Sequence, residues 1–157
     1  MLGVYFSGTG NTKHCVEYFT AQYGSDSSCV TMESGSADQE IANADTVVFG
    51  YPVCFSNMPK IVHDFIIGNQ ACFEGKRIYL IATMGLFSGD GTGCAARLLR
   101  EYGAVILGGL HLIMPDCIGD VKLLKKTPVK NQALIRRAEE KMDAAVIKLK
   151  EGKLDKE

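Results

Sequence analysis

An apolar strand pattern runs directly into a loop rich in glycine and hydroxyl groups, and this junction restricts the fold more than any other segment. Residues 4–12 read Val-Tyr-Phe-Ser-Gly-Thr-Gly-Asn-Thr, and the helical spacing of Val16, Phe19 and Tyr23 follows at once. The loop is therefore expected at a helix N-terminus, where unpaired N–H groups and the helix dipole favour an anion. The segment predicts a phosphate site built without a cation, because its polar side chains are the neutral donors Ser7, Thr9, Asn11 and Thr12.

Two commoner kinds of phosphate-binding loop fit this segment poorly. A Walker-type loop needs a lysine before its hydroxyl residue, so that the ammonium group reaches the outer phosphates. Here Lys13 comes after the hydroxyl. The dinucleotide fingerprint needs a third glycine, but Lys13 occupies that position after Gly8 and Gly10. Glu33 lies roughly where a dinucleotide-binding fold has its ribose-binding acid, so a dinucleotide site remains an alternative.

Length and charge restrict the classes of partner. With 157 residues and a formal net charge of −1, the chain is expected to form one domain and has no basic surplus for nucleic acid or an acidic membrane surface. No apolar run approaches the roughly 20 residues that span a bilayer. Because the first strand pattern begins directly at the N-terminus, with no charged leader, a cytoplasmic chain is expected.

The cysteines do not form a C-x-x-C pair, so the spacing typical of zinc, thioredoxin-like and iron–sulfur sites is missing. In a cytoplasmic chain we expect reduced thiols, several of which pack as small core side chains. Cys54 differs because it falls inside a candidate ligand-binding loop. The six are Cys15, Cys29, Cys54, Cys72, Cys94 and Cys117.

Strand and helix patterns alternate along the chain. Apolar runs predict strands at 2–6, 29–32, 46–50, 78–84 and 105–113, the last with a bend or bulge at Gly108-Gly109. Helices are expected after the first loop as far as Gly24, at 38–43, from Pro59, around 95–102 and from Thr127-Pro128. The third helix is expected to bury Ile61, Val62, Phe65 and Ile66. The pattern predicts one α/β domain at 1–150, a doubly wound, five-stranded, mainly parallel sheet, with a polar tail at 151–157.

Ligands of such sheets bind beyond the carboxyl ends of the strands. The loops after the first, third and fourth strands, at 7–12, 51–58 and 85–91, should therefore lie together. The second and third of these loops carry Phe55 and Phe87 where a solvated loop would be polar. An exposed phenylalanine favours burial against a flat ligand, and ordinary packing of the loop against the core is the alternative.

At this point the chain resembles the flavodoxin superfamily. The stretch 7–12 is similar to that family's flavin-phosphate loop, S/T-x-T-G-x-T, and the resemblance extends over almost the whole length. It looks closest to the flavodoxin-like domain fused to a ferredoxin in some anaerobes, through 4–12, 56–59, 85–91 and 108–126. No cysteine run follows Cys117, so the chain would be a stand-alone member or the flavodoxin portion of a fusion.

The resemblance implies FMN as cofactor and a strand order of 2-1-3-4-5. The phosphate would lie in the first loop, and the isoalloxazine ring would lie between the second and third, flanked by Phe55 and Phe87. Backbone groups of the second loop would face the reactive N5 edge, and those of 83–90 would bind the pyrimidine edge. No metal site is implied. The cofactor-binding residues would be Ser7, Gly8, Thr9, Gly10, Asn11, Thr12, Pro52, Val53, Cys54, Phe55, Ser56, Asn57, Thr83, Met84, Gly85, Phe87, Gly89 and Asp90.

Several individual roles stay open. The pair beside N5, which commonly includes a glycine in this family, would be Ser56-Asn57 or Asn57-Met58; asparagine tolerates positive φ better than most residues. Cys54 either contacts the flavin or packs, and Asp90 either accepts from the flavin N3–H or orders its turn. His111 either approaches the ligand or is a hydrogen-bonded strand residue. The basic run 121–126 is a solvated edge or a docking surface for an acidic redox partner.

Three functions follow from this reading. The first is an electron-transfer flavoprotein that passes electrons between redox partners such as a ferredoxin, possibly a fused one. The second is an FMN-dependent NAD(P)H or quinone reductase, and the third is an FMN-binding domain used for interaction or regulation. A net charge of −1 is less acidic than is usual for freely diffusing flavodoxins, so a tethered domain or a dedicated partner is favoured.

Overall fold

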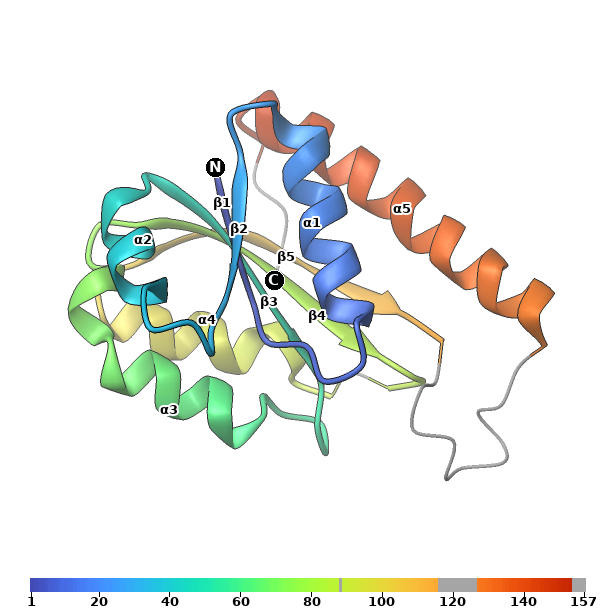
Figure 1. Cartoon of the computed structure of the whole chain (residues 1–157), viewed down its shortest axis with the longest axis horizontal. Coiled ribbons are helices and arrows are strands. Elements are labelled where there is room, and N and C mark those ends of the chain that lie inside the picture. Colours follow the sequence, from blue (N-terminus) through green and yellow to red (C-terminus); the bar gives the residue numbers. More distant parts are fainter. Residues whose placement is uncertain (88, 116–126, 154–157) are drawn as a thin grey trace.

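Five parallel strands form a single twisted sheet with helices on both faces, as seen in the computed structural model (Figure 1), which describes residues 1–87, 89–115 and 127–153. The strand order is β2-β1-β3-β4-β5, which confirms the predicted doubly wound fold. The strands are β1 Leu2–Tyr5, β2 Ser28–Thr31, β3 Thr46–Pro52, β4 Arg77–Met84 and β5 Val105–Ile113. The helices are α1 Asn11–Tyr23, α2 Ala37–Asn43, α3 Lys60–Gly68, α4 Gly91–Glu101 and α5 Pro128–Lys150, with a 3₁₀ turn η1 at Gln70–Phe73.

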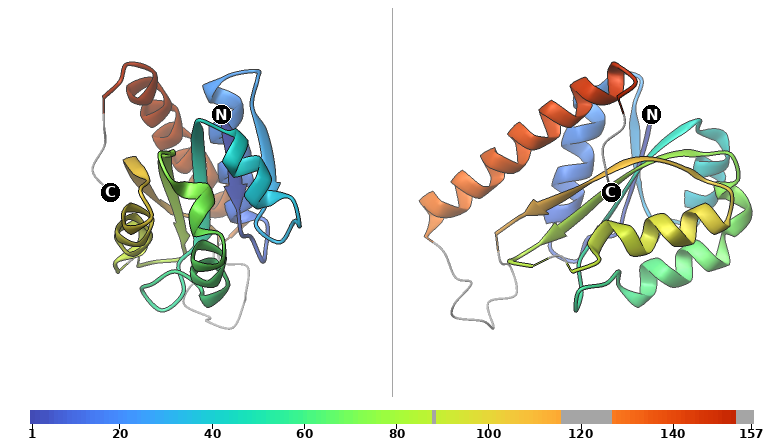
Figure 2. Two further views of the ribbon diagram at one scale, coloured as in Figure 1. Left: turned by 90° about the vertical axis from the view of Figure 1, so that its left-hand side faces the viewer. Right: turned by 180° about the vertical axis from the view of Figure 1, so that it is seen from behind.

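Each face of the sheet packs against its own set of helices (Figure 2). Helices α1 and α5 cover one face, whereas α2, α3 and α4 cover the other. The central strand β3 contributes to both cores: Phe49 and Tyr51 point to one side and Val48 to the other, and all three are fully buried. Such a strand reads as a continuous apolar run because both of its faces are covered.

Close contact between α1 and the sheet requires a residue without a side chain on β3. A Cβ placed on Gly50 would lie 2.3 Å from Cγ2 of Val16 on α1. Helix α1 therefore lies directly on the strands, which brings its N-terminus to the carboxyl ends of β1 and β3.

The predicted elements are present, and most of their boundaries differ by one or two residues. The exception is α4, which begins at Gly91, four residues before its expected start near 95. Helix α5 begins as expected, because the Thr127 side chain caps it by accepting from the Lys130 N–H at 3.4 Å. The irregularity expected at Gly108-Gly109 is present too: the β4–β5 register skips Leu107, and Gly108 has a φ of 145°. Of the predicted tail, only 151–153 lies within the described residues.

One prediction about α3 is wrong. Val62 and Ile66 are buried and Phe65 is partly so, but Ile61 is 43% exposed. The reason is geometric, because adjacent helical residues are about 100° apart around the axis and the face against the sheet is narrow. Proline at position 59 precedes the helix as its N-cap residue.

None of the helices in the described part of the chain is long and apolar enough to cross a membrane.

Candidate functional site

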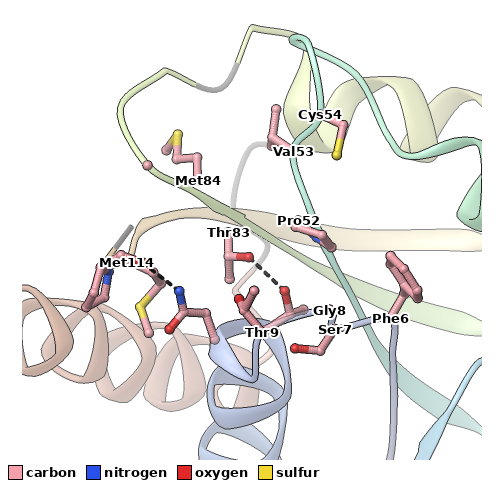
Figure 3. A pocket seen from close by; sticks show the side chains of 14 residues that line it. Phe6, Ser7, Gly8, Thr9, Pro52, Val53, Cys54, Thr83, Met84 and Met114 are labelled. Atoms are coloured by element: carbon pink, nitrogen blue, oxygen red, sulfur yellow. Dashed lines mark hydrogen bonds between the residues drawn. The ribbon is translucent and has the colours of Figure 1, made fainter. Parts of the chain in front are cut away.

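A cavity of about 290 Å³ opens at the carboxyl ends of β1, β3 and β4, where the loops that follow these strands meet (Figure 3). The 14 side chains that line it carry no formal charge. They are Phe6, Ser7, Gly8, Thr9, Asn11, Thr12, Pro52, Val53, Cys54, Thr83, Met84, Gly85, Met114 and Pro115. The cavity therefore suits a ligand with a large apolar part and an anionic group that uncharged donors hold.

The first loop turns tightly into α1. Gly10, with a φ of 94°, is the N-cap residue of the helix; its N–H donates to Oγ of Ser7 at 3.1 Å and its carbonyl accepts from the His14 N–H at 2.9 Å. Because Oγ of Ser7 acts as an acceptor there, its own hydrogen remains available to a ligand. The first turn of α1 holds no acidic side chain, so the positive end of the helix dipole is not offset locally.

Two side chains of this loop bind neighbouring strand ends (Figure 3). Oγ1 of Thr12 lies 2.7 Å from Oγ1 of Thr83 at the end of β4. Nδ2 of Asn11 donates to the carbonyl of Pro115, after β5, at 2.8 Å. The amide of Asn11 is thus engaged with protein, although the sequence suggested it as a donor to phosphate.

The second loop is a two-residue hairpin turn. Cys54 and Asn57 exchange backbone hydrogen bonds of 2.9 and 3.0 Å, and the two residues between them, Phe55 and Ser56, have φ values of 48° and 64°. Positive φ at both central positions is the type I′ turn, which normally contains asparagine and glycine. Asn57, the residue of the two candidate pairs that tolerates positive φ best, does not adopt it, because the Cys54–Asn57 pair closes the hairpin one residue earlier.

The third loop packs against this turn. Gly89 has a φ of 53°, and a Cβ placed there would lie 2.2 Å from Cβ of Ser56. In addition, the Asp90 N–H donates to the Ser56 carbonyl at 3.2 Å. The two loops are therefore one structural unit, and glycine at position 89 is needed both for backbone conformation and for space.

Asp90 and Arg97 form an exposed ion pair across the first turns of α4. The hydrogen bond from Arg97 is the main cause that lowers the pKa of the Asp90 carboxyl below its ordinary value. Asp90 was expected to bind a ligand or order its turn. The structure gives its carboxylate a partner on α4 that the sequence pattern did not single out.

Three exposed apolar side chains, Phe55, Leu86 and Phe87, belong to the loops after β3 and β4 but do not line the cavity. Phe55 is fully exposed, and Leu86 and Phe87 are 67% and 73% exposed. Burying a phenylalanine is worth about 1.5–3 kcal/mol, so these side chains gain from any flat ligand or partner that covers them.

The sequence-predicted cofactor residues divide into two groups. Those that line the cavity are Ser7, Gly8, Thr9, Asn11, Thr12, Pro52, Val53, Cys54, Thr83, Met84 and Gly85. Those that do not are Gly10, Phe55, Ser56, Asn57, Phe87, Gly89 and Asp90. Phe6, Met114 and Pro115 also line it but were not predicted. The signal for the last two was their place after the fifth strand, which ends at the same edge of the sheet.

The cysteines and histidines occupy varied environments. Burial, with a smaller contribution from Glu139, raises the pKa of the Cys15 thiol to about 12, as suits a core residue. Cys29, Cys72 and Cys94 are partly buried, and Cys54 is exposed. Cys117 and the basic run 121–126 lie outside the described residues.

His111 is a hydrogen-bonded strand residue, which was one of its two expected roles. Its Nε2 accepts from the Thr92 N–H at 3.0 Å and lies 3.1 Å from Oγ1 of Thr92. Burial is the main cause that lowers its pKa; Lys141 lowers it further, and Asp90 opposes them. His14 contacts Glu139 on α5, and His63 is exposed beside Asp64.

Comparison with known proteins identifies the family to which this fold belongs. A family model described as a flavodoxin domain matches residues 2–107. The chain belongs to the flavodoxin family. Members of this family bind flavin. No curated protein matches the chain.

Solved flavodoxins share the fold at low sequence identity. The two-electron reduced flavodoxin of Megasphaera elsdenii has 21% identity over 93% of this chain and 98% of its own, with a TM-score of 0.66. Oxidised flavodoxin 2 of Bacillus cereus has 16% identity over 96% and 97%, with a TM-score of 0.66. An NADH:FMN oxidoreductase in its apo form has 16% identity over 92% and 88%, with a TM-score of 0.61.

Proposed function

We propose that this flavodoxin domain binds FMN and transfers electrons between redox partners. The observation that carries the proposal is the uncharged cavity whose one end is the N-terminus of α1. A phosphate monoester suits that end, because helix N–H groups and hydroxyls supply donors and the dipole supplies positive potential. A flat ring system suits the other end, which Pro52, Val53 and Met84 make largely apolar.

The residues present fit the cofactor. Ser7, Thr9 and the first turn of α1 would hold the phosphate, and backbone groups of the second and third loops would meet the ring edges. Phe55 and Phe87 are exposed and would cover the ring faces. The flavin would supply the redox chemistry, whereas the chain orients it and shields it from water.

An electron donor or acceptor protein is part of the proposal. The modest net charge of −1 supports a dedicated or tethered partner, such as a ferredoxin in the same or another chain, because a freely diffusing carrier relies on strong charge to steer encounters.

The alternative is an FMN-dependent NAD(P)H or quinone reductase. The exposed apolar side chains Phe55, Leu86 and Phe87 favour it, since they would form the wall of a substrate pocket if covered by another surface. A purely regulatory FMN domain is the third possibility.

Cofactor binding is tested by titrating the apoprotein with FMN and with riboflavin, using flavin fluorescence. We expect FMN to bind at least tenfold more tightly, and Ser7→Ala with Thr9→Ala to remove most of that difference. The matched control is Lys13→Ala, since Lys13 is exposed and paired with Glu17. It should change FMN affinity by less than about twofold, because exposed ion pairs contribute little. Equal affinity for both flavins, or strong dependence on Lys13, would contradict a cation-free phosphate site.

The reaction is tested on the FMN-loaded protein. Reduction by a reduced ferredoxin, without NAD(P)H oxidation in the presence of quinone, is expected for the carrier. Rapid NAD(P)H oxidation with quinone alone would establish the reductase instead. Bound FMN that exchanges electrons with neither class would leave the regulatory reading.

A further inference from the structure

The open edge of β5 has a main chain ready to pair with another strand. Within residues 1–87, 89–115 and 127–153, β5 is the last strand of the sheet on its side, next to β4. The Met114 N–H donates toward β4, to the Met84 carbonyl at 2.8 Å. Since main-chain directions alternate along a strand, the N–H and C=O groups of Gly109, His111 and Ile113 point away from β4, to the open edge.

A groove runs between this edge and α5. In one half, Gly109, Leu110 and His111 face Lys141 and Lys148. In the other half, Leu112 and Ile113 face Arg137 and Lys141. The strand segment 109–113 and the helix segment 137–148 both extend over about 17 Å at the rises of a strand and a helix. Strand and helix therefore border the groove over the same length.

The described side chains that line the groove carry charges of one sign. Arg137, Lys141 and Lys148 are exposed, and their spacings of four and seven residues set them on one face of α5. No carboxylate lines either half of the groove among the described residues.

Two acidic residues of α5, Glu139 and Asp143, lie on its flank toward α1, whereas Glu140 is exposed. Glu139 contacts Nε2 of His14 at 3.0 Å, and Asp143 accepts from the Tyr18 hydroxyl at 3.1 Å. The opposite edge of the sheet, at β2, is bordered by Asp26 and Glu40 instead. The basic character is thus particular to the β5 edge.

We propose that this groove binds an extended, acidic segment of a partner protein, which adds a strand to the β5 edge and directs alternate carboxylates at Arg137 and Lys141. Main-chain pairing with an exposed edge is a known mode of peptide recognition, in which side chains at every second position give specificity. A polypeptide is favoured over a nucleic acid because the open edge offers main-chain donors and acceptors in strand register. The proposal does not rest on the bound cofactor.

One end of the groove lies near the candidate flavin site. β5 continues from Ile113 into Met114 and Pro115, which line the cavity. A segment that pairs with β5 would therefore end beside the candidate flavin site and would hold its protein there.

The test is fluorescence anisotropy with a labelled peptide in which glutamate and threonine alternate over seven residues. We expect saturable binding that Arg137→Glu and Lys141→Glu each weaken about tenfold or more. The matched control is Arg136→Glu, which makes the same charge change on the adjacent, exposed residue outside the groove. It should have an effect smaller than about twofold. A peptide of the same sequence with alternate backbone nitrogens methylated should bind at least tenfold more weakly.

Three results would overturn the proposal: equal losses in the Arg136 and Arg137 variants, undiminished binding of the methylated peptide, or tighter binding of an oligothymidylate of equal charge. Concentration-dependent dimerisation in sedimentation that Arg137→Glu abolishes would make a second copy the occupant instead. All variants are surface changes, and their folding is checked by circular dichroism. Each titration is run with and without FMN, so that failure of the cofactor proposal leaves this test intact.

Discussion

The hydroxyl oxygens of Thr12 and Thr83 lie 2.7 Å apart, and both side chains are buried. This contact joins the first turn of α1 to the end of β4, two elements 71 positions apart in the sequence. A pair of hydroxyls has two hydrogens and uses one between its oxygens, so the accepting group keeps a hydrogen for another acceptor. The pair therefore fixes the end of the first loop against the sheet and retains a donor beside the cavity.

We expect Thr83→Val to preserve the volume of the side chain while leaving the Thr12 hydroxyl without its partner. An unsatisfied buried hydroxyl costs about 1–3 kcal/mol, so the free energy of unfolding should fall by that amount. FMN affinity should fall as well, because the first loop loses its anchor. Urea unfolding and flavin titration measure the two effects. Thr20→Val is the control: Thr20 is equally buried, but its hydroxyl bonds to the Val16 carbonyl and to the Cys29 thiol and not to a loop of the site, so its change should leave FMN affinity intact.

Gly89 is expected to tolerate no side chain. Alanine at this position combines a φ of 53° with a contact of 2.2 Å to Cβ of Ser56. Strain of this kind costs about 1–3 kcal/mol, which we expect as lost stability or as separation of the second and third loops with weaker FMN binding. Gly35→Ala serves as the control, since an added Cβ there meets nothing within 4 Å. Equal, small effects of both substitutions would show that the two loops do not depend on each other.

The fold could be read from the sequence because each element carries a local signal. The apolar run of β3, the cap at Thr127 and the glycines of β5 each act through neighbouring residues. The contacts that shape the site join residues that are far apart in the sequence. Thr12 meets Thr83, Asn11 meets Pro115 and Gly89 meets Ser56 only after the sheet brings distant loops together. The rule that loops after parallel strands meet at the carboxyl edge of the sheet predicts which loops lie together. It does not predict which of their side chains contact one another.

The turn at Phe55 and Ser56 illustrates the same limit. Nothing local favours positive φ at phenylalanine and serine, and the sequence pointed to Asn57. The hairpin bonds between Cys54 and Asn57 impose the conformation, against the preference of the two residues that adopt it.

Ser56→Gly should relieve part of this strain. The left-handed region costs residues other than glycine about 1–2 kcal/mol. Glycine avoids this cost, but its greater conformational entropy in the unfolded chain offsets part of the gain in folding stability. We expect a net stabilisation of about 0.5–1 kcal/mol and a melting temperature that rises by a few degrees. Ser25→Gly is the control, because Ser25 lies in an exposed turn and is not at positive φ. A loss of stability in the Ser56 variant would show that the serine side chain contributes more than its backbone conformation costs.

His111 makes stability depend on pH in a direction that the structure determines. Because Nε2 accepts from the Thr92 N–H at 3.0 Å, the folded protein requires the neutral ring with its hydrogen on Nδ1. Burial and the charge of Lys141 act the same way and lower the pKa of His111 below 6.5, against a smaller opposite effect of Asp90. The unfolded chain then takes up the proton first as the pH falls.

The contribution of His111 should be fully present above about pH 6.5 and decline as the pH falls through the folded-state pKa. We expect the difference in unfolding free energy between the wild type and His111→Gln, whose amide oxygen keeps an acceptor near Nε2, to shrink as the pH is lowered from 8 toward 5. Urea unfolding at several pH values measures it. His63→Gln, an exposed change on α3, should show no comparable slope. A difference that stays constant, or that grows on acidification, would mean that the charged ring is tolerated beside Thr92.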